Sequence, residues 1–257
     1  MRQSYSRENS PWFKDRYIML PDIIKSWVDS YVNLANARVL DFGCGHGITA
    51  LAMAMRFNAR VLGVDIMPDP AECLPRAHAE LGIGALPENL ELRRIEPGED
   101  FREGDQFDLI YSWSAFEHVS QDIFDRVLGQ IKSRLSQNGC FFLQIAPLYY
   151  SAEGSHLFHR IPEPWGHILN QESIYFRKLS ESCESDEEVA ALWSCFQHLN
   201  RLTASDLAQR LHRHGFEIIR EHKTQDQYHP HAGLETVIHP DVLKTNQVVF
   251  LARHVSC

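Results

Sequence analysis

The stretch Val39-Leu40-Asp41-Phe42-Gly43-Cys44-Gly45-His46-Gly47 joins a short apolar strand to a glycine-rich turn, and the helical run Ile48 to Phe57 follows it directly. Glycines between a strand and a helix let a ligand approach the backbone closely, because no Cβ stands in the way. An acid, Asp41, precedes the glycines. Its negative charge would repel a phosphate but suits a cation such as an ammonium group. The turn therefore predicts a nucleotide-like ligand with a positively charged part.

A second buried strand, Arg60 to Asp65, also ends in an acid. A carboxylate at that place can accept hydrogen bonds from both hydroxyls of a ribose. Hydrophobic periodicity predicts further strands at 90–95, 107–112, 140–146, 216–222 and 247–254, and helices from Pro21 to 32 and at 71–82, 121–135, 189–199 and 203–214. Alternating strands and helices are typical of a mostly parallel sheet with helices on both faces.

Residues 147–202 interrupt this alternation with tyrosines, histidines and prolines. They leave the fifth strand at the carboxyl edge of the sheet, where open α/β sheets bind their ligands. We therefore expect a single domain over 1–257, with an N-terminal helical cap at 1–34 and an inserted lid at 147–202. A self-packed surface loop with aromatic anchors is the alternative for the insertion.

Three motifs in order resemble the class I S-adenosylmethionine-dependent methyltransferases. They are the glycine stretch at 39–47, the strand end Gly63-Val-Asp-Ile66, and Phe107-Asp-Leu-Ile-Tyr-Ser-Trp-Ser-Ala-Phe-Glu-His-Val119. The helix and strand at 121–146, with Asn138-Gly139 between them, match the next segment of that family. The resemblance is closest to the ubiquinone-biosynthesis type of small-molecule methyltransferase. It implies a Rossmann-like fold with a seven-stranded sheet, S-adenosylmethionine as methyl donor and S-adenosylhomocysteine as product.

The resemblance also implies which residues hold the donor. Asp41 and the turn would hold its amino acid part, Asp65 its ribose and Ile66 its adenine, with the loop at 96–100 beside the base. The full expected set is Asp41, Gly43, Cys44, Gly45, Asp65, Ile66, Pro97, Gly98, Glu99, Ser112 and Trp113. Two other interpretations stay open, because Asp41 can instead cap the following helix and Cys44 can be a small packing residue.

Methyl transfer to a hydroxyl needs a base, since the nucleophile carries a proton at neutral pH. Histidine titrates in the right range. We expect His118, after the fourth strand, and His156, in the insertion, to be the catalytic candidates. The expected acceptor-binding residues are Tyr149, Tyr150, His159, Trp165 and His167.

The insertion offers enough donors for a metal ion, in Glu153, His156, His159 and His167. No helix fixes their spacing, however, and the family resemblance implies acids around the sheet edge as the ligands of a cation-dependent methyltransferase. The sequence interpretation is therefore that the protein holds no metal.

The bulk composition excludes several classes of function. A net charge of -9 argues against an extended nucleic-acid surface, which needs clustered Lys and Arg. No apolar run is long enough to span a membrane, and the N-terminus does not resemble a signal peptide, so we expect a cytoplasmic protein. Its six cysteines contain no CxxC pair and are expected to be free thiols.

We therefore expect an enzyme that methylates a small molecule or glycan, such as a sugar, a glycan intermediate or a secondary metabolite. Oxygen is favoured over nitrogen or carbon as the acceptor atom, and a homodimer is an open option. Two alternatives remain: a non-catalytic binding or scaffold protein on the same fold, and another nucleotide-dependent enzyme such as an NAD-dependent one.

Overall fold

The computed structural model describes residues 10–67, 69–101 and 104–255. The chain divides into two compact units. The first comprises Met1–Trp113, Gln130–Phe142 and Leu251–Cys257, and the second comprises Ser114–Gly129 and Leu143–Phe250. The described helices give no candidate membrane span, because none combines sufficient length with sufficient apolar character.

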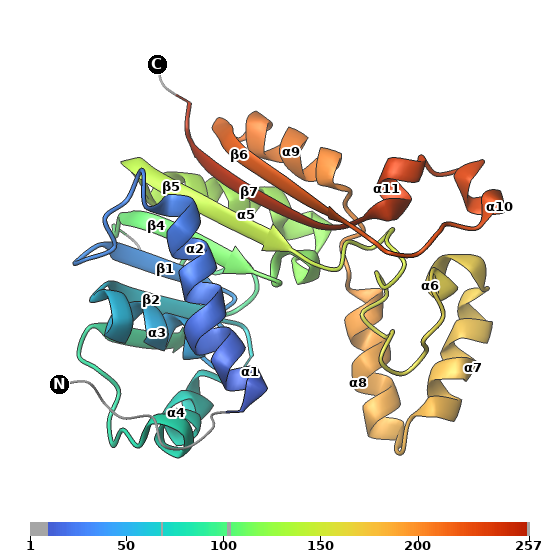
Figure 1. The fold of residues 1–257 in the computed structure, drawn as a ribbon, viewed down its shortest axis with the longest axis horizontal. Helices are drawn as coiled ribbons and strands as arrows, with labels where there is room; N and C mark the ends of the chain where they lie inside the picture. The colour runs from blue at the N-terminus through green and yellow to red at the C-terminus, as the bar shows by residue number, and fades with distance from the viewer. Residues whose placement is uncertain (1–9, 68, 102–103, 256–257) are drawn as a thin grey trace. The chain divides into compact units, whose positions relative to one another are not determined.

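The chain forms a seven-stranded sheet with the order β3-β2-β1-β4-β5-β7-β6. Its strands are β1 (Arg38–Phe42), β2 (Arg60–Asp65), β3 (Leu90–Arg94), β4 (Phe107–Trp113), β5 (Leu135–Ile145), β6 (Phe216–Gln225) and β7 (Thr245–His254). The pairs β1–β2, β1–β4 and β2–β3 are parallel. In Figure 1 the arrow of β7 runs opposite to that of β6. The predicted Rossmann-like, mostly parallel sheet is confirmed.

The structure has a helix at each predicted place, namely α2, α3, α4, α5, α8 and α9 in the list that follows, and the other helices in that list were not predicted. The helices are α1 (Pro11–Lys14), α2 (Leu20–Val28), α3 (Ile48–Phe57), α4 (Cys73–Leu81), α5 (Gln121–Arg134), α6 (Gly166–Leu169), α7 (Glu172–Ser182), α8 (Asp186–Gln197), α9 (Ala204–Arg213), α10 (Ala232–Glu235) and α11 (Pro240–Lys244). Shorter turns lie at η1 (Asp15–Met19), η2 (Asp69–Glu72) and η3 (Phe116–His118).

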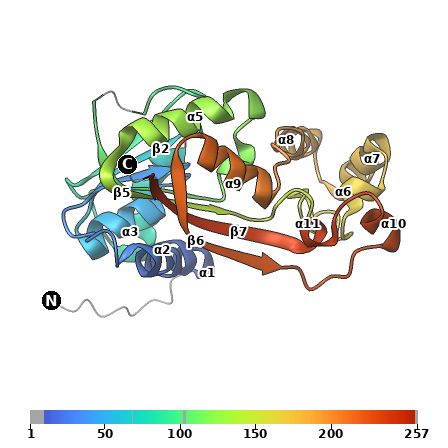
Figure 2. The same cartoon turned by 90° about the horizontal axis from the view of Figure 1, so that it is seen from above.

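In the first unit, α3 begins at the glycine turn. Gly47 has φ 74°, a left-handed conformation that glycine adopts without strain. The helix buries every residue from Ile48 to Ala54, because it lies between the sheet and the N-terminal helices. Figures 1 and 2 show α2 and α3 on the same face of β1 and β2. Phe13 and Tyr17 pack against α3, so the described part of the expected cap is helical already from Pro11.

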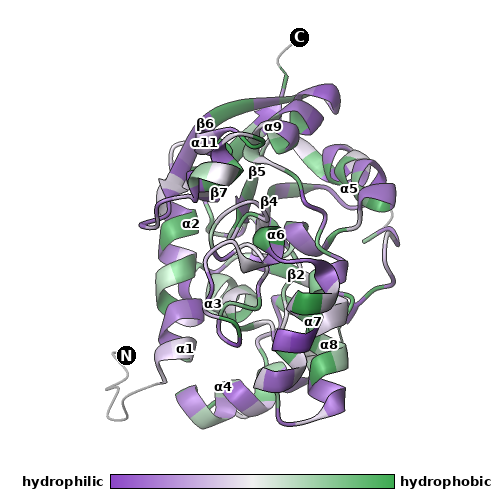
Figure 3. Cartoon of the chain, turned by 90° about the vertical axis from the view of Figure 1, so that its right-hand side faces the viewer, coloured by the Kyte–Doolittle hydropathy of each residue, from purple (hydrophilic) through white to green (hydrophobic). Residues whose placement is uncertain are grey.

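The second unit contains a pair of neighbouring helices, α7 and α8, with an apolar core between them. Its buried members include Tyr175, Leu179, Val189 and Phe196. Figure 3 shows both helices carrying hydrophilic and hydrophobic segments, as expected for helices with one buried face. The predicted Ser185 cap opens α8 by accepting a hydrogen bond from the Glu188 amide. Helix α7 was not predicted from the sequence.

A capping box opens α9, as the sequence predicts. The Thr203 hydroxyl accepts from the Asp206 amide, and the Asp206 carboxylate accepts from the Thr203 amide. Gly215, with φ 75°, follows the end of the helix. These local contacts satisfy terminal backbone groups that a helix leaves without partners.

Candidate functional site

In the first unit, the acid before the glycine turn is deeply buried. Asp41 is 3% exposed, and its Oδ2 accepts a hydrogen bond of 2.7 Å from the Tyr111 hydroxyl. The two residues are partners in the parallel register of β1 and β4. Burial raises the pKa of Asp41 to about 7, while the Tyr111 hydrogen bond opposes this rise and the charge of Asp65 adds to it. A cation placed beside Asp41 would favour the charged carboxylate.

The second acid lies at the end of β2 and holds the glycine turn. Asp65 Oδ2 accepts from the Gly45 amide at 2.7 Å, and Oδ1 accepts from the Met67 amide at 2.9 Å. Each carboxylate oxygen has two lone pairs, so both oxygens can accept a further hydrogen bond. A Cβ built on Gly45 would meet nothing within 4 Å. The turn therefore leaves open space beside a carboxylate that can accept two hydroxyl donors.

Apolar side chains follow Asp65 along the chain. Ile66 is 46% exposed and Met67 is 54% exposed. Both side chains are therefore accessible at the strand end that carries Asp65. The adenine contact expected of Ile66 stays a prediction, and Met67 is an additional candidate.

The loop at 96–100, which is expected beside the adenine, is held by hydrogen bonds among its own residues. The Glu99 carboxylate accepts from the Glu96 amide at 2.8 Å, and the Glu99 amide donates to the Glu96 carbonyl at 2.9 Å. The Gly98 carbonyl accepts from Gln130 Nε2 at 3.0 Å. Glu99 thus shapes the loop that presents Pro97 and Gly98.

The remaining residues of the expected donor set lie at the ends of β1 and β4. Cys44 is packed against Gly63, where an added Cβ would stand 3.1 Å from the thiol sulfur. Ser112 is buried, and its hydroxyl oxygen has no hydrogen-bond partner among the residues described. Trp113 stacks on Phe142 with ring centroids 6.1 Å apart. Cys44 and Trp113 therefore have packing contacts at the ends of β1 and β4.

In the second unit, a short turn presents Glu117 and His118. The turn is held by Asn200, whose Nδ2 donates to the carbonyls of Phe116 at 2.6 Å and Val119 at 3.2 Å. The Asn200 amide also donates to the Glu117 carbonyl at 2.9 Å. Glu117 is 4% exposed, and burial raises the pKa of its carboxyl to about 8.

The two histidines proposed as bases lie together in this unit. The rings of His118 and His156 have centroids 5.1 Å apart and meet edge to face. One ring nitrogen of His156 is 3.1 Å from the Pro147 carbonyl, and Cys195 Sγ is 3.9 Å from His118 Nδ1. Burial and the nearby His118 lower the pKa of His156 to about 4. His156 is therefore neutral at pH 7.

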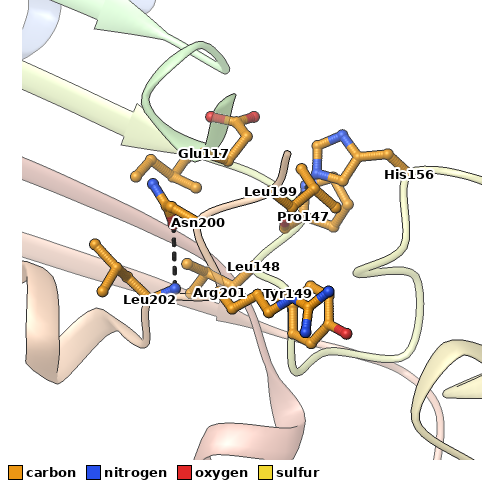
Figure 4. Close-up of a pocket in the computed structure, with 10 residues that line it drawn as sticks. Glu117, Pro147, Leu148, Tyr149, His156, Leu199, Asn200, Arg201 and Leu202 are labelled. Atoms are coloured by element: carbon orange, nitrogen blue, oxygen red, sulfur yellow. Dashed lines mark hydrogen bonds between the residues drawn. The ribbon is translucent and has the colours of Figure 1, made fainter. Parts of the chain in front are cut away.

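A small cavity of about 10 Å³ lies beside this cluster. Figure 4 shows Glu117, His156 and Asn200 on its wall, with the Arg201 side chain running beside the Tyr149 ring. The guanidinium carbon is 5.0 Å from the centroid of that ring. A cavity of this size accommodates about one water-sized particle.

The other expected acceptor-binding residues have different surroundings. Trp165 is 2% exposed, and its Nε1 donates to the Tyr150 carbonyl at 3.0 Å. His167 is buried, with one ring nitrogen 2.6 Å from the Tyr149 carbonyl, and burial lowers its pKa to about 4. His159 is exposed. Of the five, Tyr149 lines the cavity, whereas Trp165 belongs to an apolar core with Ala152, Leu234 and Leu243. An acceptor role stays a prediction for all five.

Four residues that the structure places near Asp41 and Asp65 or near His118 and His156 were not selected from the sequence. They are Tyr111, Met67, Glu117 and Asn200. Glu117 carried a signal, because it directly precedes the histidine that was selected. Asn200 lies 82 positions after His118 in a segment without a motif, so only the folded chain reveals its contact with the turn.

Comparison with known proteins identifies relatives of this chain. A family model described as a methyltransferase domain matches residues 19–221. A ubiquinone biosynthesis O-methyltransferase of Pseudomonas fluorescens is 38% identical over 97 residues, which cover 37% of this chain and 38% of that protein. The chain is thus matched to less than half the length of this curated relative.

Two solved structures have a similar fold. An S-adenosylmethionine-dependent methyltransferase from Clostridium acetobutylicum is 11% identical to this chain, with a TM-score of 0.58. The match covers 95% of this chain and 97% of that one. The 1,6-didemethyltoxoflavin-N1-methyltransferase of Burkholderia thailandensis, with bound S-adenosylhomocysteine, is 17% identical. Its TM-score is 0.53, and the match covers 96% of this chain and 82% of that one.

Proposed function

Because this chain belongs to the class I S-adenosylmethionine-dependent methyltransferases, we propose that it transfers a methyl group to an oxygen of a small polar acceptor. The observation that carries the proposal is the pair of acids at the ends of two adjacent parallel strands, around a glycine turn with open space at Gly45. The O-methyltransferase named among the relatives supports oxygen as the acceptor atom. A sugar, a glycan intermediate or a secondary metabolite fits the proposal.

The donor-binding residues act by charge and by hydrogen bonding. Ionised Asp41 binds the ammonium group of the donor, and Asp65 accepts hydrogen bonds from its ribose hydroxyls. Ile66 covers the adenine, with the Pro97-Gly98 loop beside it. When bound, S-adenosylmethionine supplies a methyl group on a positively charged sulfur. The acceptor oxygen bonds to that methyl carbon as the carbon–sulfur bond breaks, and the electron pair of that bond stays on sulfur.

The proton of the acceptor hydroxyl must leave during this displacement. We propose His118 and His156 for this step, because their rings lie together with centroids 5.1 Å apart. Tyr149, Tyr150, His159, Trp165 and His167 remain the proposed acceptor-binding set, and 147–202 the proposed lid. A cytoplasmic location and a homodimer also remain predictions.

Two experiments test the function. A thermal-shift assay compares S-adenosylmethionine, S-adenosylhomocysteine and NAD; we expect the first two to raise the melting temperature and NAD to leave it unchanged. A transfer assay then follows a labelled methyl group from the donor into panels of hydroxyl and amine acceptors. Stabilisation by NAD alone would favour another nucleotide-dependent enzyme. Donor binding without transfer to any acceptor would favour the scaffold alternative.

A further inference from the structure

The cluster of Glu117, His118 and His156 brings together three groups that commonly bind metal ions. One ligand atom from each residue lies within 4.8 Å of the other two. A tetrahedral ion with bonds near 2.1 Å separates its ligand atoms by about 3.4 Å. Side-chain rotations that move these atoms by about an ångström would therefore close the set around one ion.

The Glu117 carboxyl group supplies an independent indication of a ligand. The side chain is 4% exposed, and neither carboxylate oxygen has a hydrogen-bond partner among the described residues. Buried carboxyl groups are ordinarily paired, hydrogen-bonded or bound to a metal, since burial without a partner is costly. The adjacent cavity of about 10 Å³ has room for an ion or a water.

The backbone around the cluster is held in place. Asn200 fixes the turn of Glu117 and His118 through three hydrogen bonds to its carbonyl groups. His156 has φ 61°, a conformation uncommon for residues other than glycine. One of its ring nitrogens is 3.1 Å from the Pro147 carbonyl. Metal-ligating histidines typically use one ring nitrogen in such a contact, which leaves the other for the ion.

We propose that Glu117, His118 and His156 bind one divalent ion of a first-row transition metal, such as Zn²⁺ or Co²⁺. Two imidazoles and one carboxylate suit these ions, whereas Mg²⁺ prefers oxygen ligands and keeps several waters. Three protein ligands leave at least one position open for an oxygen of water or of an acceptor. The two imidazoles are the proposed bases of the ion-free chain, and in the ion-bound chain they act as ligands. This proposal differs from the sequence interpretation, which expected no metal.

The test uses the full chain after treatment with a chelator. Zn²⁺ binding is followed by titration calorimetry, and Co²⁺ binding by visible absorption. The variants are Glu117→Gln, which removes the charge at constant shape, and His156→Asn, since asparagine tolerates the left-handed conformation. His222→Asn is the matched control, because His222 is exposed in the same unit but lies outside the cluster. His118→Ala, at an exposed position, is the third ligand variant.

We expect the unaltered protein to bind one Zn²⁺ or Co²⁺ per chain. Losing a partner of a metal ligand typically lowers affinity 10–100-fold, so we expect removal of a ligand to lower it at least about a hundredfold. The His222→Asn control should bind within about twofold of the unaltered protein. Circular dichroism and the thermal shift with S-adenosylhomocysteine show whether each variant is folded.

Three results would overturn the proposal: no Zn²⁺ or Co²⁺ binding by the unaltered protein, unchanged affinity in the folded ligand variants, or binding of Mg²⁺ in preference to Zn²⁺. The metal titration does not use the methyl donor. Failure to bind S-adenosylhomocysteine would therefore contradict the proposed function alone, and failure to bind Zn²⁺ and Co²⁺ would contradict the metal site alone.

Discussion

If Asp41 binds the ammonium group of the donor as proposed, its burial should make donor binding depend on pH. Its pKa is about 7 in the ligand-free chain, chiefly because burial disfavours the charged carboxylate. Binding of an ammonium group requires the ionised form. A group of pKa 7 is about three quarters ionised at pH 7.5 and about 3% ionised at pH 5.5. The affinity for S-adenosylhomocysteine should therefore fall about 25-fold between these two values, which corresponds to about 1.9 kcal/mol.

Titration calorimetry from pH 5.5 to 7.5 measures this change. Two buffers with different ionisation enthalpies report the proton that Asp41 releases on binding, which should approach one per chain at pH 5.5. Tyr111→Phe removes the hydrogen bond that opposes the raised pKa. In that variant the loss of affinity should begin at a higher pH. Tyr31→Phe, at an exposed position of the same unit, serves as the control. An affinity that is constant with pH would refute the role of Asp41, as would a shift of Tyr111→Phe toward lower pH.

Three further predictions concern packing, the turn and the histidines. Gly63→Ala should lower the free energy of unfolding in urea by about 1–3 kcal/mol, because the new Cβ would stand 2.7 Å from Leu92 Cδ2. Unchanged stability would contradict this prediction and show that the Leu92 side chain moves away freely. Asn200→Ala should cost about 1–3 kcal/mol in the same assay, since it removes the donor to two backbone carbonyls; a loss below about 0.5 kcal/mol would contradict this. His118→Ala and His156→Ala should each lower methyl-transfer turnover about a hundredfold or more; full turnover in both would exclude a role in the reaction.

Gly129→Ala is the control for Gly63→Ala. Gly129 is in α5, and an added Cβ would meet nothing within 4 Å. Alanine is favoured over glycine in a helix by about 1 kcal/mol, so this variant should be slightly more stable than the unaltered protein.

Most of the fold could be predicted because its elements have strong local patterns. The strands β1 and β2 are short buried runs that end in acids, and α3 begins directly after three glycines. The box of Thr203 and Asp206 marks the start of α9 by residue type and spacing alone. Helix α7 was missed because its few apolar positions, such as Tyr175 and Leu179, are separated by polar residues, and they bury against α8 and against the segment 157–161.

The sites could be predicted only in part. Asp41 and Asp65 lie at the carboxyl ends of β1 and β2. Their proximity could be predicted because these two strands are adjacent and parallel. The contact between Asp41 and Tyr111 depends on the register of β1 and β4, which the sequence does not display. Glu117 and His156 lie on separate segments 39 positions apart, and only folding of the second unit brings them together. Long-range contacts of this kind have no local periodicity that a sequence interpretation can use.

The central claim, that two strand-end acids bind the methyl donor, is tested most directly by titrating S-adenosylmethionine into Asp41→Ala and Asp65→Ala. Asp29→Ala, at an exposed ion pair with Lys25, is the control. We predict that calorimetry detects binding in the unaltered protein and the control, and none in Asp41→Ala or Asp65→Ala. Unchanged affinity in both of these variants, with each shown to be folded by circular dichroism, would contradict the assignment of the donor site.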